Sequence, residues 1–445
     1  MIFRKTKDKL IFLLFLLFAA FLCPSISYAD AWAEEEGGWK YRYDDGSYEH
    51  GGWKWIDGNR DGICECYYFY EDGSIAVDTT TPDGFQVDET GAWTENGTVQ
   101  EHPAKVSFAV TGDNLIHKEL ILFGQELGNY DFLYDWTLEQ ELKNKDIAVL
   151  SQETIFVDRP ENYSGFPAFG TPLQVGESAL KAGFNMAACA TNHAMDKGMA
   201  GINTTAAFYE ANGIPYLGIQ SADHPAYEPF RLITVNGVRL ALFDYTYGTN
   251  GIRIPAAFPH AVHLLQDPAV ISADLSAGRN AADAVIVFVH WGTEYQPSPD
   301  EKQLFWKQLF LESGVDVVVG THPHVLQPMQ VEEREDGHRM LIYYSLGNLV
   351  SRQDRHESSI GGMAEFSIER NAEGCSFTDF SLRPVICHQT ATWSQSGMLE
   401  LYPEERAKEH RMHLTKKEWM DLFMAWTSGT GTILTEEDNG IEEQT

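Results

Sequence analysis

Six short apolar runs in this sequence each end in a side chain that can bind a metal or move a proton. The polar residues that follow these runs are, in chain order, Asp113, Glu153, Asn192 with His193, His290, His322 with His324, and Asn348. A single histidine among the 15 of the chain would be read as an ordinary surface or core residue. Four histidines that each follow an apolar run, together with two carboxylates, instead predict one shared site.

The elements that must position these residues are predicted to alternate between strands and helices. The apolar runs have the composition of buried strands, and they span residues 106–110, 146–150, 185–190, 284–289, 315–319 and 341–344. Helical spacing of apolar residues occurs at residues 172–182, 199–212 and 301–313. This alternation predicts the α/β class, with a layered α/β sandwich over residues 104–390. Ligand sites in such folds lie beyond the carboxyl ends of strands, which is where the polar residues fall.

The types of donor in this set indicate a divalent metal. Carboxylate, amide oxygen and imidazole suit Mn, Fe or Zn, and no thiolate is among them. A site with several such ligands can hold two metals about 3.5–4 Å apart, which activate a water for in-line attack on phosphorus. The residues therefore predict metal-dependent hydrolysis of a phosphoester.

Taken together, the motifs resemble those of the CapA family, which is named for poly-γ-glutamate capsule synthesis. The matching motifs are Thr111-Gly112-Asp113, Gln152-Glu153, Thr191-Asn192-His193-Ala194-Met195-Asp196, His290-Trp291-Gly292, Thr321-His322-Pro323-His324 and Ser345-Leu346-Gly347-Asn348. The family belongs to the calcineurin-like metallophosphoesterase superfamily. The resemblance covers about residues 104–390 and implies a metallophosphoesterase-like sandwich.

The resemblance also implies a role for each matching residue. The implied metal ligands are Asp113, Glu153, Asn192, His290, His322 and His324. His193 would protonate the leaving group or steady the transition state, and Asp196 would orient it. Asn348 would shape the pocket. Glu294 and Tyr295 would either line the substrate pocket or serve only as loop residues.

The sequence departs from the superfamily pattern at two motifs. The superfamily has a histidine two residues after the first aspartate, where this chain has Leu115, and His117 is the alternative ligand. The Gly-Asp second motif is replaced by Gln152-Glu153. These departures leave one tightly bound metal open as an alternative to two.

The first 29 residues have the features of a secretory signal peptide. Four basic residues precede an apolar run at residues 10–22, and Ser27-Tyr28-Ala29 offers small residues at a cleavage site. An uncleaved anchor is the alternative. No later segment is long and apolar enough to span a bilayer. We therefore expect a protein secreted to the cell wall surface of a Gram-positive-type bacterium.

Residues 37–100 are rich in Trp, Tyr, Gly and Asp and contain imperfect repeats. Gly37-Gly38-Trp39-Lys40-Tyr41 recurs as Gly51-Gly52-Trp53-Lys54-Trp55, a pattern that predicts stacked β-hairpins. The region resembles choline- and glucan-binding cell-wall repeats. That resemblance implies aromatic cages for a wall ligand, with Trp39, Trp53, Trp55 and Tyr68 as candidate residues. Alternatively, these aromatic side chains only form the hairpin core.

The formal net charge of −33 disfavours binding to nucleic acid. Two functions remain open: a surface hydrolase, or a non-catalytic assembly or export factor for an anionic capsule polymer. The expected partner is a cell-wall polymer or an anionic capsule polymer, and the oligomeric state stays undetermined. Residues 391–445 are predicted to form an extension, with an amphipathic helix at residues 416–426 and an acidic, disordered tail.

Overall fold

The computed structural model describes residues 31–35, 37–43, 46–355 and 357–427. The predicted signal peptide and the acidic end of the chain lie outside these ranges. The contacts between Cα atoms divide the described chain into two units. Unit 1 contains the residues up to Asn59 together with Cys64–Glu101, and unit 2 contains Arg60–Ile63 and the chain from His102 onward. None of the helices in these ranges combines the length and the apolarity of a membrane-spanning helix.

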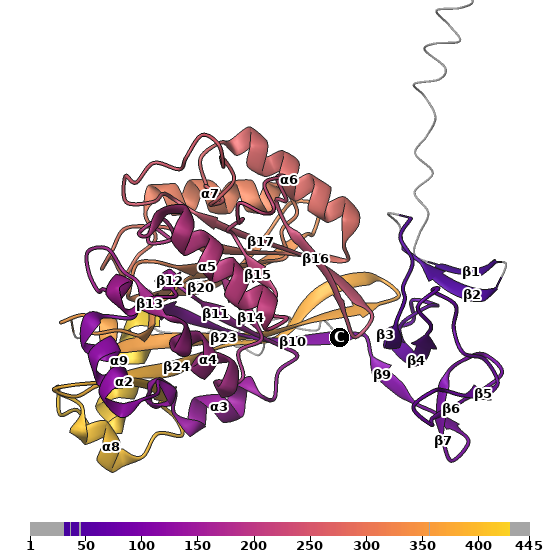
Figure 1. Cartoon of the computed structure of the whole chain (residues 1–445), viewed down its shortest axis with the longest axis horizontal. Helices are drawn as coiled ribbons and strands as arrows, with labels where there is room; N and C mark the ends of the chain where they lie inside the picture. Colours follow the sequence, from indigo (N-terminus) through magenta and orange to yellow (C-terminus); the bar gives the residue numbers. More distant parts are fainter. Residues whose placement is uncertain (1–30, 36, 44–45, 356, 428–445) are drawn as a thin grey trace, which may run out of the picture. The chain divides into compact units, whose positions relative to one another are not determined.

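Unit 1 consists of short antiparallel hairpins with glycines at their turns (Figure 1). Its strands are β1 (Ala31–Glu35), β2 (Gly38–Arg42), β3 (Gly52–Ile56), β4 (Ile63–Phe69), β5 (Thr79–Thr80), β6 (Gln86–Val87), β7 (Trp93–Glu95) and β8 (Thr98–Val99), and β9 (Glu101–Pro103) follows. Gly73 and Gly91 have φ of 82° and 87°, values that the other residues rarely adopt. The small core packs Tyr41, Tyr67 and Phe69 together.

A second aromatic group in unit 1 lies outside that core. The Trp53 ring is 5.4 Å from Tyr68, 5.9 Å from Phe85 and 5.9 Å from Trp93. The Trp53 indole nitrogen donates to Asp83. The structure thus brings together two of the predicted wall-ligand residues, and Trp55 joins them through its contact with Trp93. Trp39, which is 43% exposed, makes no ring contact with the other described residues.

Unit 2 is built on two mixed sheets. The first has the order β15-β14-β11-β10-β23-β24-β25, and β22 also pairs with β10. The second has the order β16-β17-β18-β19-β21-β20. The first sheet contains β10 (Lys105–Asn114), β11 (Ile147–Ser151), β14 (Met186–Ala188), β15 (Tyr216–Leu217), β22 (Asn348–Val350), β23 (Ile360–Asn371), β24 (Gly374–Gln389) and β25 (Ser394–Met398). The second contains β16 (Arg231–Val235), β17 (Val238–Thr246), β18 (Ala284–His290), β19 (Val317–Thr321), β20 (Leu326–Glu333) and β21 (Arg339–Leu346).

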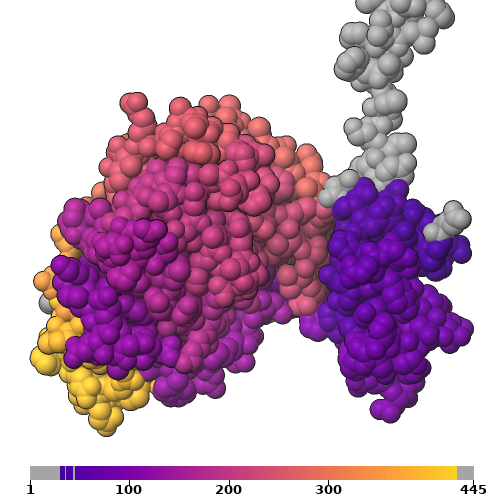
Figure 2. All heavy atoms as spheres, viewed as in Figure 1, coloured from indigo at the N-terminus to yellow at the C-terminus, as the bar shows by residue number. Residues whose placement is uncertain are grey.

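The two sheets face each other, and helices cover their outer sides. Tyr343 of the second sheet donates its hydroxyl to the carbonyls of Glu365 and Ser381 in the first. One apolar core joins the first sheet to α2 (Lys118–Leu127), α3 (Trp136–Leu142), α4 (Leu173–Ala182) and α5 (Gly198–Ala211). The other joins the second sheet to α6 (Pro268–Ala281) and α7 (Glu301–Glu312). In Figure 2 the magenta and pink segments, which include α5 and α6, cover much of the visible face of unit 2.

The predicted fold class, an α/β sandwich preceded by small β-hairpins, is confirmed. Three predicted helices appear as α4, α5 and α7 within one residue of the expected ends. Local chemistry explains such accuracy: Asp300 and Gln303 form a capping box at the start of α7, and Gly183 with φ of 117° ends α4.

The predicted amphipathic helix at residues 416–426 appears as α9 (Lys416–Thr427), preceded by α8 (Glu404–Glu409). The side chains of Trp419 and Phe423 on α9 are fully buried. The first sheet itself continues past residue 390, because β25 pairs with β24. The described part of the C-terminal extension is therefore packed into the sandwich.

Candidate metal centre

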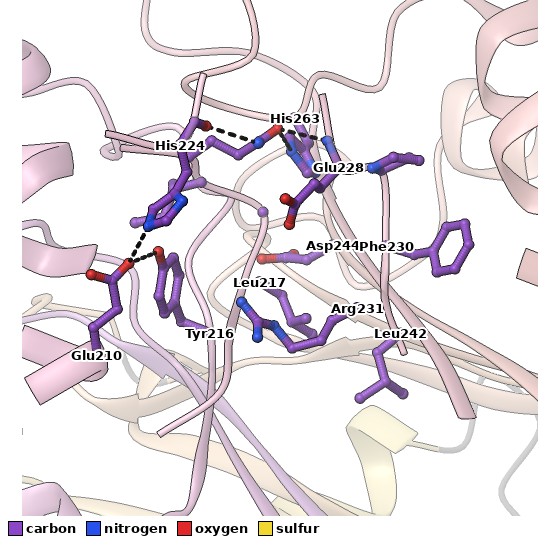
Figure 3. Close-up of a pocket in the computed structure, with 14 residues that line it drawn as sticks. Glu210, Tyr216, Leu217, His224, Glu228, Phe230, Arg231, Leu242, Asp244 and His263 are labelled. Atoms are coloured by element: carbon purple, nitrogen blue, oxygen red, sulfur yellow. Dashed lines mark hydrogen bonds and ion pairs between the residues drawn. The ribbon is translucent and has the colours of Figure 1, made fainter. Parts of the chain in front are cut away.

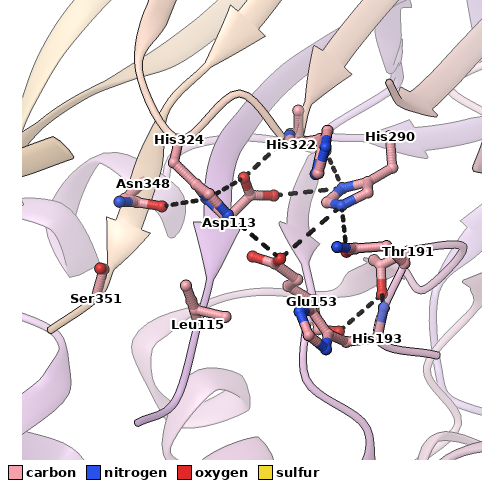
Figure 4. A network of polar contacts seen from close by, with 12 residues as sticks. Asp113, Leu115, Glu153, Thr191, His193, His290, His322, His324, Asn348 and Ser351 are labelled. Carbon is pink, nitrogen blue, oxygen red and sulfur yellow. Dashed lines mark hydrogen bonds and ion pairs between the residues drawn. The ribbon is translucent and has the colours of Figure 1, made fainter. Parts of the chain in front are cut away.

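The six predicted ligands come from strand ends of both sheets and meet in one buried place (Figure 4). Asp113 lies near the end of β10, and Glu153 and Asn192 follow β11 and β14. His290 ends β18, whereas His322 and His324 follow β19. Each of these six side chains is at most 3% exposed. Residues separated by more than 200 positions along the chain thus form a single cluster.

Gly112 and Gly347 allow the backbone to approach closely beside Asp113. A Cβ atom on Gly112 would lie 2.1 Å from the Gly347 carbonyl oxygen, which is far inside contact distance. The Asp113 amide donates to that same oxygen. The Asp113 carboxylate in turn accepts hydrogen bonds from the Ser151 hydroxyl and the His322 amide. Glycine at position 112 is therefore required to place the first acidic ligand.

Within the cluster, the distances join the ligands into a continuous set. Asp113 Oδ2 lies 3.3 Å from His324 Nδ1, and Asp113 Oδ1 lies 3.6 Å from His290 Nδ1. Glu153 Oε1 lies 3.7 Å from His324 Nε2 and 3.9 Å from His290 Nε2. His290 Nε2 is 2.9 Å from the Asn192 amide oxygen. Asp113, Glu153 and His324 can each point one ligand atom at the same cation, since those atoms lie within 4.8 Å of one another.

Glu153 shows most directly that these residues fit a cation. Its carboxylate is fully buried, and neither oxygen has a hydrogen-bond partner among the described residues. A buried carboxylate without a partner is strongly unfavourable unless a cation or a proton neutralises it. His322 Nδ1 is also buried without a partner in the described ranges. These orphaned donor atoms are what a divalent metal would bind.

Burial and neighbouring charges shift the pKa values of the candidate ligands. Burial, together with the adjacent histidines, lowers the pKa of His290 and His322 well below the usual value, so both rings are neutral ligands at pH 7. Burial raises the pKa of Glu153. Burial alone would lower the pKa of His324, but Glu153 and Asp113 raise it to about 9. The Glu153–His324 pair therefore retains a proton that a bound metal must displace.

Metal affinity is accordingly expected to rise with pH. Because His324 has a pKa of about 9, proton competition weakens as the pH approaches that value. The apparent affinity for Mn²⁺ should increase by up to about tenfold per unit between about pH 6 and about pH 9. Competition with a chelator, corrected for the chelator's own protonation, measures this slope. An affinity that does not change over this interval would contradict the protonated pair.

Partners outside the ligand set hold the histidine rings in place. His290 Nδ1 lies 3.0 Å from the Thr321 hydroxyl, and His324 Nδ1 lies 3.0 Å from the Asn348 amide oxygen. Asn348 itself donates to Gln353. Such outer contacts fix the ring orientation of metal-binding histidines. Asn348 therefore positions His324, which is more specific than the pocket-shaping role expected for it.

The backbone at this site adopts conformations that are rare for residues other than glycine. His322 and His324 have φ of 98° and 58°, and Tyr295 has φ of 63°. Conformations of this kind cost about 1–3 kcal/mol each and cluster at functional sites. The loop after β19 therefore holds its two histidines in position at an energetic cost.

His193 and Asp196 form a separate pair at the edge of the cluster. His193 Nδ1 lies 2.7 Å from Asp196 Oδ2, and that oxygen also accepts the Phe169 amide. The edge of the His193 ring meets Phe169 at 4.7 Å between centroids. Nδ1 is occupied by the carboxylate, so Nε2 is the atom left to exchange a proton. The Asp196 carboxylate thus lies where it can fix the orientation of the His193 ring.

His117 is not brought into the ligand set. Its Nδ1 lies 3.1 Å from the Leu115 carbonyl oxygen and 3.2 Å from the Arg352 amide nitrogen. Burial lowers the pKa of the His117 imidazole to about 4. Its ring packs edge-on against Phe169. The described contacts are those of a histidine that fastens two backbone segments together.

The sequence did not mark Glu294, Tyr247 or Asn250 as metal ligands or as contacts of them, although it placed Glu294 in the substrate pocket or in a loop. Glu294, His322 and His324 form a second group whose ligand atoms lie within 4.8 Å of one another. Glu294 follows His290 by four residues, and that short spacing is the only signal that could have marked it as a ligand. Tyr247 packs 4.6 Å from the His322 ring, and Asn250 accepts from Asn192. Neither of these two residues carries a recognisable motif.

A two-sheet α/β sandwich with this donor set at its strand ends defines a protein suited to binding divalent metal. Residues 107–353, more than half of the chain, match the family of bacterial capsule synthesis proteins called PGA_cap. The chain belongs to this family, which confirms the resemblance to CapA proteins.

Curated relatives carry related names. The chain is 28% identical over 221 residues to the PGA biosynthesis protein CapA of Bacillus subtilis, covering 49% of this chain and 56% of that protein. It is 29% identical over 243 residues to the capsule biosynthesis protein CapA of Bacillus anthracis, covering 52% and 56%. The matches thus span about half the length of these relatives.

Solved structures with related folds include the Haemophilus influenzae NAD nucleotidase, with a TM-score of 0.39, 12% identity and coverage of 72% of this chain and 59% of that one. The Thermus thermophilus sulfate thiohydrolase matches with a TM-score of 0.38, 11% identity and coverage of 72% and 60%. Scores at this level support no inference about activity.

Proposed function

We propose that this protein is a metal-dependent hydrolase that cleaves a phosphoester in the metabolism of a capsule or envelope polymer. The buried Glu153 carboxylate carries the proposal, since two imidazoles approach it within 4 Å and no hydrogen-bond donor satisfies it among the described residues. Two divalent metals, Mn, Fe or Zn, would suit this donor set, with His324 able to bind only one of them because its Nδ1 contacts Asn348.

Metals bound there would supply Lewis acidity and an activated water. The residues of the chain would contribute orientation and proton transfer. His193 Nε2 would donate a proton to the leaving oxygen, while Asp196 holds the ring and stabilises its protonated form. Thr321 and Asn348 would keep His290 and His324 from rotating. Tyr247, which is 40% exposed and stacks near His322, would border the substrate.

Arg355 is well placed to recognise an anionic substrate beside this centre. Its guanidinium carbon lies 3.9 Å from the centre of the Tyr295 ring, and Tyr295 lies 6.0 Å from the His324 ring. Gln353 donates to the Tyr295 hydroxyl and accepts from Asn348. No carboxylate pairs with Arg355 in the described ranges, so its charge remains available. A substrate phosphate or carboxylate would find this cation at the rim of the site.

Arg355→Gln is therefore expected to weaken substrate binding while hardly slowing the chemical step. KM for an anionic phosphodiester should rise about tenfold or more, equivalent to about 1.4 kcal/mol, while kcat changes little. Steady-state kinetics measures both constants. The matched control is Arg339→Gln, since Arg339 is also exposed and also lies over an aromatic ring, that of Phe377. A fall in kcat without a change in KM would rule out substrate recognition by Arg355.

The alternative function is a non-catalytic assembly or export factor for an anionic polymer of the poly-γ-glutamate type. The name of the Bacillus subtilis relative, a PGA biosynthesis protein, favours this polymer, and the name of the Bacillus anthracis relative favours a capsule. The same metal centre would then serve to hold polymer carboxylates. Assays of purified protein on phosphodiesters, amides and polyglutamate with added manganese separate the two functions. Turnover supports the hydrolase, whereas metal and polymer binding without turnover supports the assembly factor.

We also propose that unit 1 binds a cell-wall polymer and anchors a secreted protein at the surface. The aromatic group of Trp53, Tyr68, Phe85 and Trp93 supports this, because Phe85 is 43% exposed and rings of this kind stack on sugar faces or cations.

The double variant Trp39→Ala/Tyr68→Ala is expected to bind isolated cell walls at least about tenfold more weakly than the wild type, because it removes two aromatic rings that would contact the wall ligand. A sedimentation assay with purified walls gives the affinity. Trp136→Ala is the control, since Trp136 is a 58% exposed tryptophan of unit 2. If the double variant and the Trp136→Ala control sediment equally with the walls, the Trp39 and Tyr68 rings have only a packing role.

A further inference from the structure

A second polar cavity lies apart from the metal centre in unit 2. It has a volume of about 340 Å³, and none of the residues that line it is a candidate metal ligand. It opens between β15 at the edge of the first sheet and β16 and β17 of the second (Figure 3). The residues that give it chemical character are Glu210, Tyr216, Gln220, Glu228, Arg231 and Asp244.

Asp244 is the buried acidic group among the residues that line this cavity. The side chain is 3% exposed, and its Oδ2 accepts the amides of Cys189 and Ala190 at 2.7 and 2.8 Å. In the part of the chain that the structure describes, no donor bonds its other oxygen, Oδ1. Figure 3 shows the carboxylate pointing into the cavity. A buried carboxylate with a free oxygen is satisfied by a ligand that donates protons or carries positive charge.

The backbone is shaped around this carboxylate. A Cβ atom on Gly218 would lie 2.3 Å from Asp244 Oδ2, and Gly218 has φ of 80°. Any other residue at this position would collide with the carboxylate and be strained. Burial raises the pKa of Asp244 to about 7, so the group is charged in mildly alkaline solution. Because Gly218 has no side chain, the Asp244 carboxylate has room to lie at the wall of the cavity.

Arg231 provides the opposite charge at the mouth of the cavity. Its guanidinium lies 5.6 Å from the Tyr216 ring and has no ion-pair partner among the described residues. The neighbouring Glu210 is already engaged, because it accepts the Tyr216 hydroxyl at 2.6 Å. Glu228 is exposed at the same mouth. The cavity thus offers one free acidic oxygen inside and one free guanidinium at its opening.

We propose that this cavity binds a small zwitterion, an α-amino acid with a basic or neutral side chain. Its ammonium group would donate to Asp244, and its carboxylate would pair with Arg231. Glu210 and Glu228 at the mouth favour a basic side chain over an acidic one. The volume is typical of a site for a small molecule. This proposal does not depend on whether the metal centre is catalytic.

Binding of such a ligand would also affect the backbone segment that leads to the metal centre. Cys189 and Ala190, whose amides Asp244 holds, precede Asn192 and His193 by only a few residues. Donation from a bound ammonium would fix the Asp244 carboxylate and, through it, the start of this loop. We therefore expect amide hydrogen exchange at Cys189 and Ala190 to slow when the cavity is filled.

Isothermal titration of the full chain at about pH 8, where the acidic group is charged, tests the site. The probes are L-lysine, L-glutamate, cadaverine and glutarate. The last two lack the α-carboxylate of lysine and the ammonium of glutamate, respectively. We expect lysine to bind at least about tenfold more tightly than each of the other three. If cadaverine binds as tightly as lysine, or if none of the amino acids binds, the zwitterion site is overturned.

Two variants locate the binding. Arg231→Gln changes an exposed side chain and should leave the fold intact, while Asp244→Asn keeps an oxygen for the two amides. Each is expected to weaken lysine binding by about tenfold or more, whereas Arg339→Gln should have no effect. Unchanged affinity in Arg231→Gln overturns the site even if Asp244→Asn fails to fold. Since the readout is binding alone, the absence of hydrolysis would not affect this result.

Discussion

Asp113→Asn is expected to abolish metal binding and hydrolysis together while the protein remains folded. The substituted amide can keep its oxygen toward the His322 amide and donate from its nitrogen to the Ser151 hydroxyl oxygen, so both contacts that fix the loop can persist. The negative charge that His290 and His324 face is lost, however. We expect metal affinity and turnover to fall by at least about 100-fold, since even removal of an outer contact costs about 10- to 100-fold.

Elemental analysis and a phosphodiester assay on the same sample check this result. Asp135→Asn is the control, because Asp135 is also buried, also accepts a backbone amide (that of Thr137 at the start of α3) and also faces a cationic side chain, that of Arg406. Asparagine serves well at such a helix start, so metal content and turnover should stay at the wild-type level. Full metal occupancy in Asp113→Asn would mean that the carboxylate is not a ligand.

His193→Ala is expected to separate chemistry from metal binding. The imidazole belongs to neither ligand group, so metal content should be unchanged. Turnover should fall by about 10²- to 10⁴-fold, the usual contribution of a general acid. Asp196→Asn should have a smaller effect and should alter the pH profile, because it weakens the hydrogen bond that orients His193 Nδ1.

His338→Gln is the control for this experiment. Among the described residues, the His338 ring forms a hydrogen bond only with the Val315 carbonyl oxygen. This variant should retain both metal and turnover. Loss of metal from His193→Ala would make His193 a ligand, and full turnover would exclude it as the acid. Metal content must therefore be measured in every preparation before its rate is interpreted.

The clustering of the candidate ligands could be predicted from sequence because each one follows a short apolar run with the composition of a buried strand. Parallel strands bring such ends to one edge of a sheet, so the sequence alone predicts that Asp113 and Glu153 lie close together. The helices could also be predicted, because the N-cap residue Asp300 and the C-terminal Gly183 are local signals for the start and the end of a helix. Information of this kind is contained within a few residues of each element.

Other features depend on contacts between distant segments. Arg355 reaches the centre only because its loop folds over Tyr295, and no pattern in residues 351–355 indicates this. His117 is the histidine nearest in sequence to the expected ligand position, yet the Arg352 amide contacts its Nδ1. Asp244 resembles any acid in an apolar strand, and its free oxygen becomes apparent only when β15 and β17 are placed side by side. The surroundings of Arg355, His117 and Asp244 are therefore set by the packing of segments that are distant in the sequence.

The left-handed backbone at His322 and His324 has a consequence for protein engineering. Glycine would relieve about 1–3 kcal/mol of backbone strain at each position, but it would also remove a buried imidazole and leave a cavity behind. A directed-evolution campaign that selects only for survival at high temperature, in the presence of a chelator, would therefore act on these two opposing effects and not on metal binding. Thermostable descendants chosen in this way must be tested for metal content before their activity is interpreted.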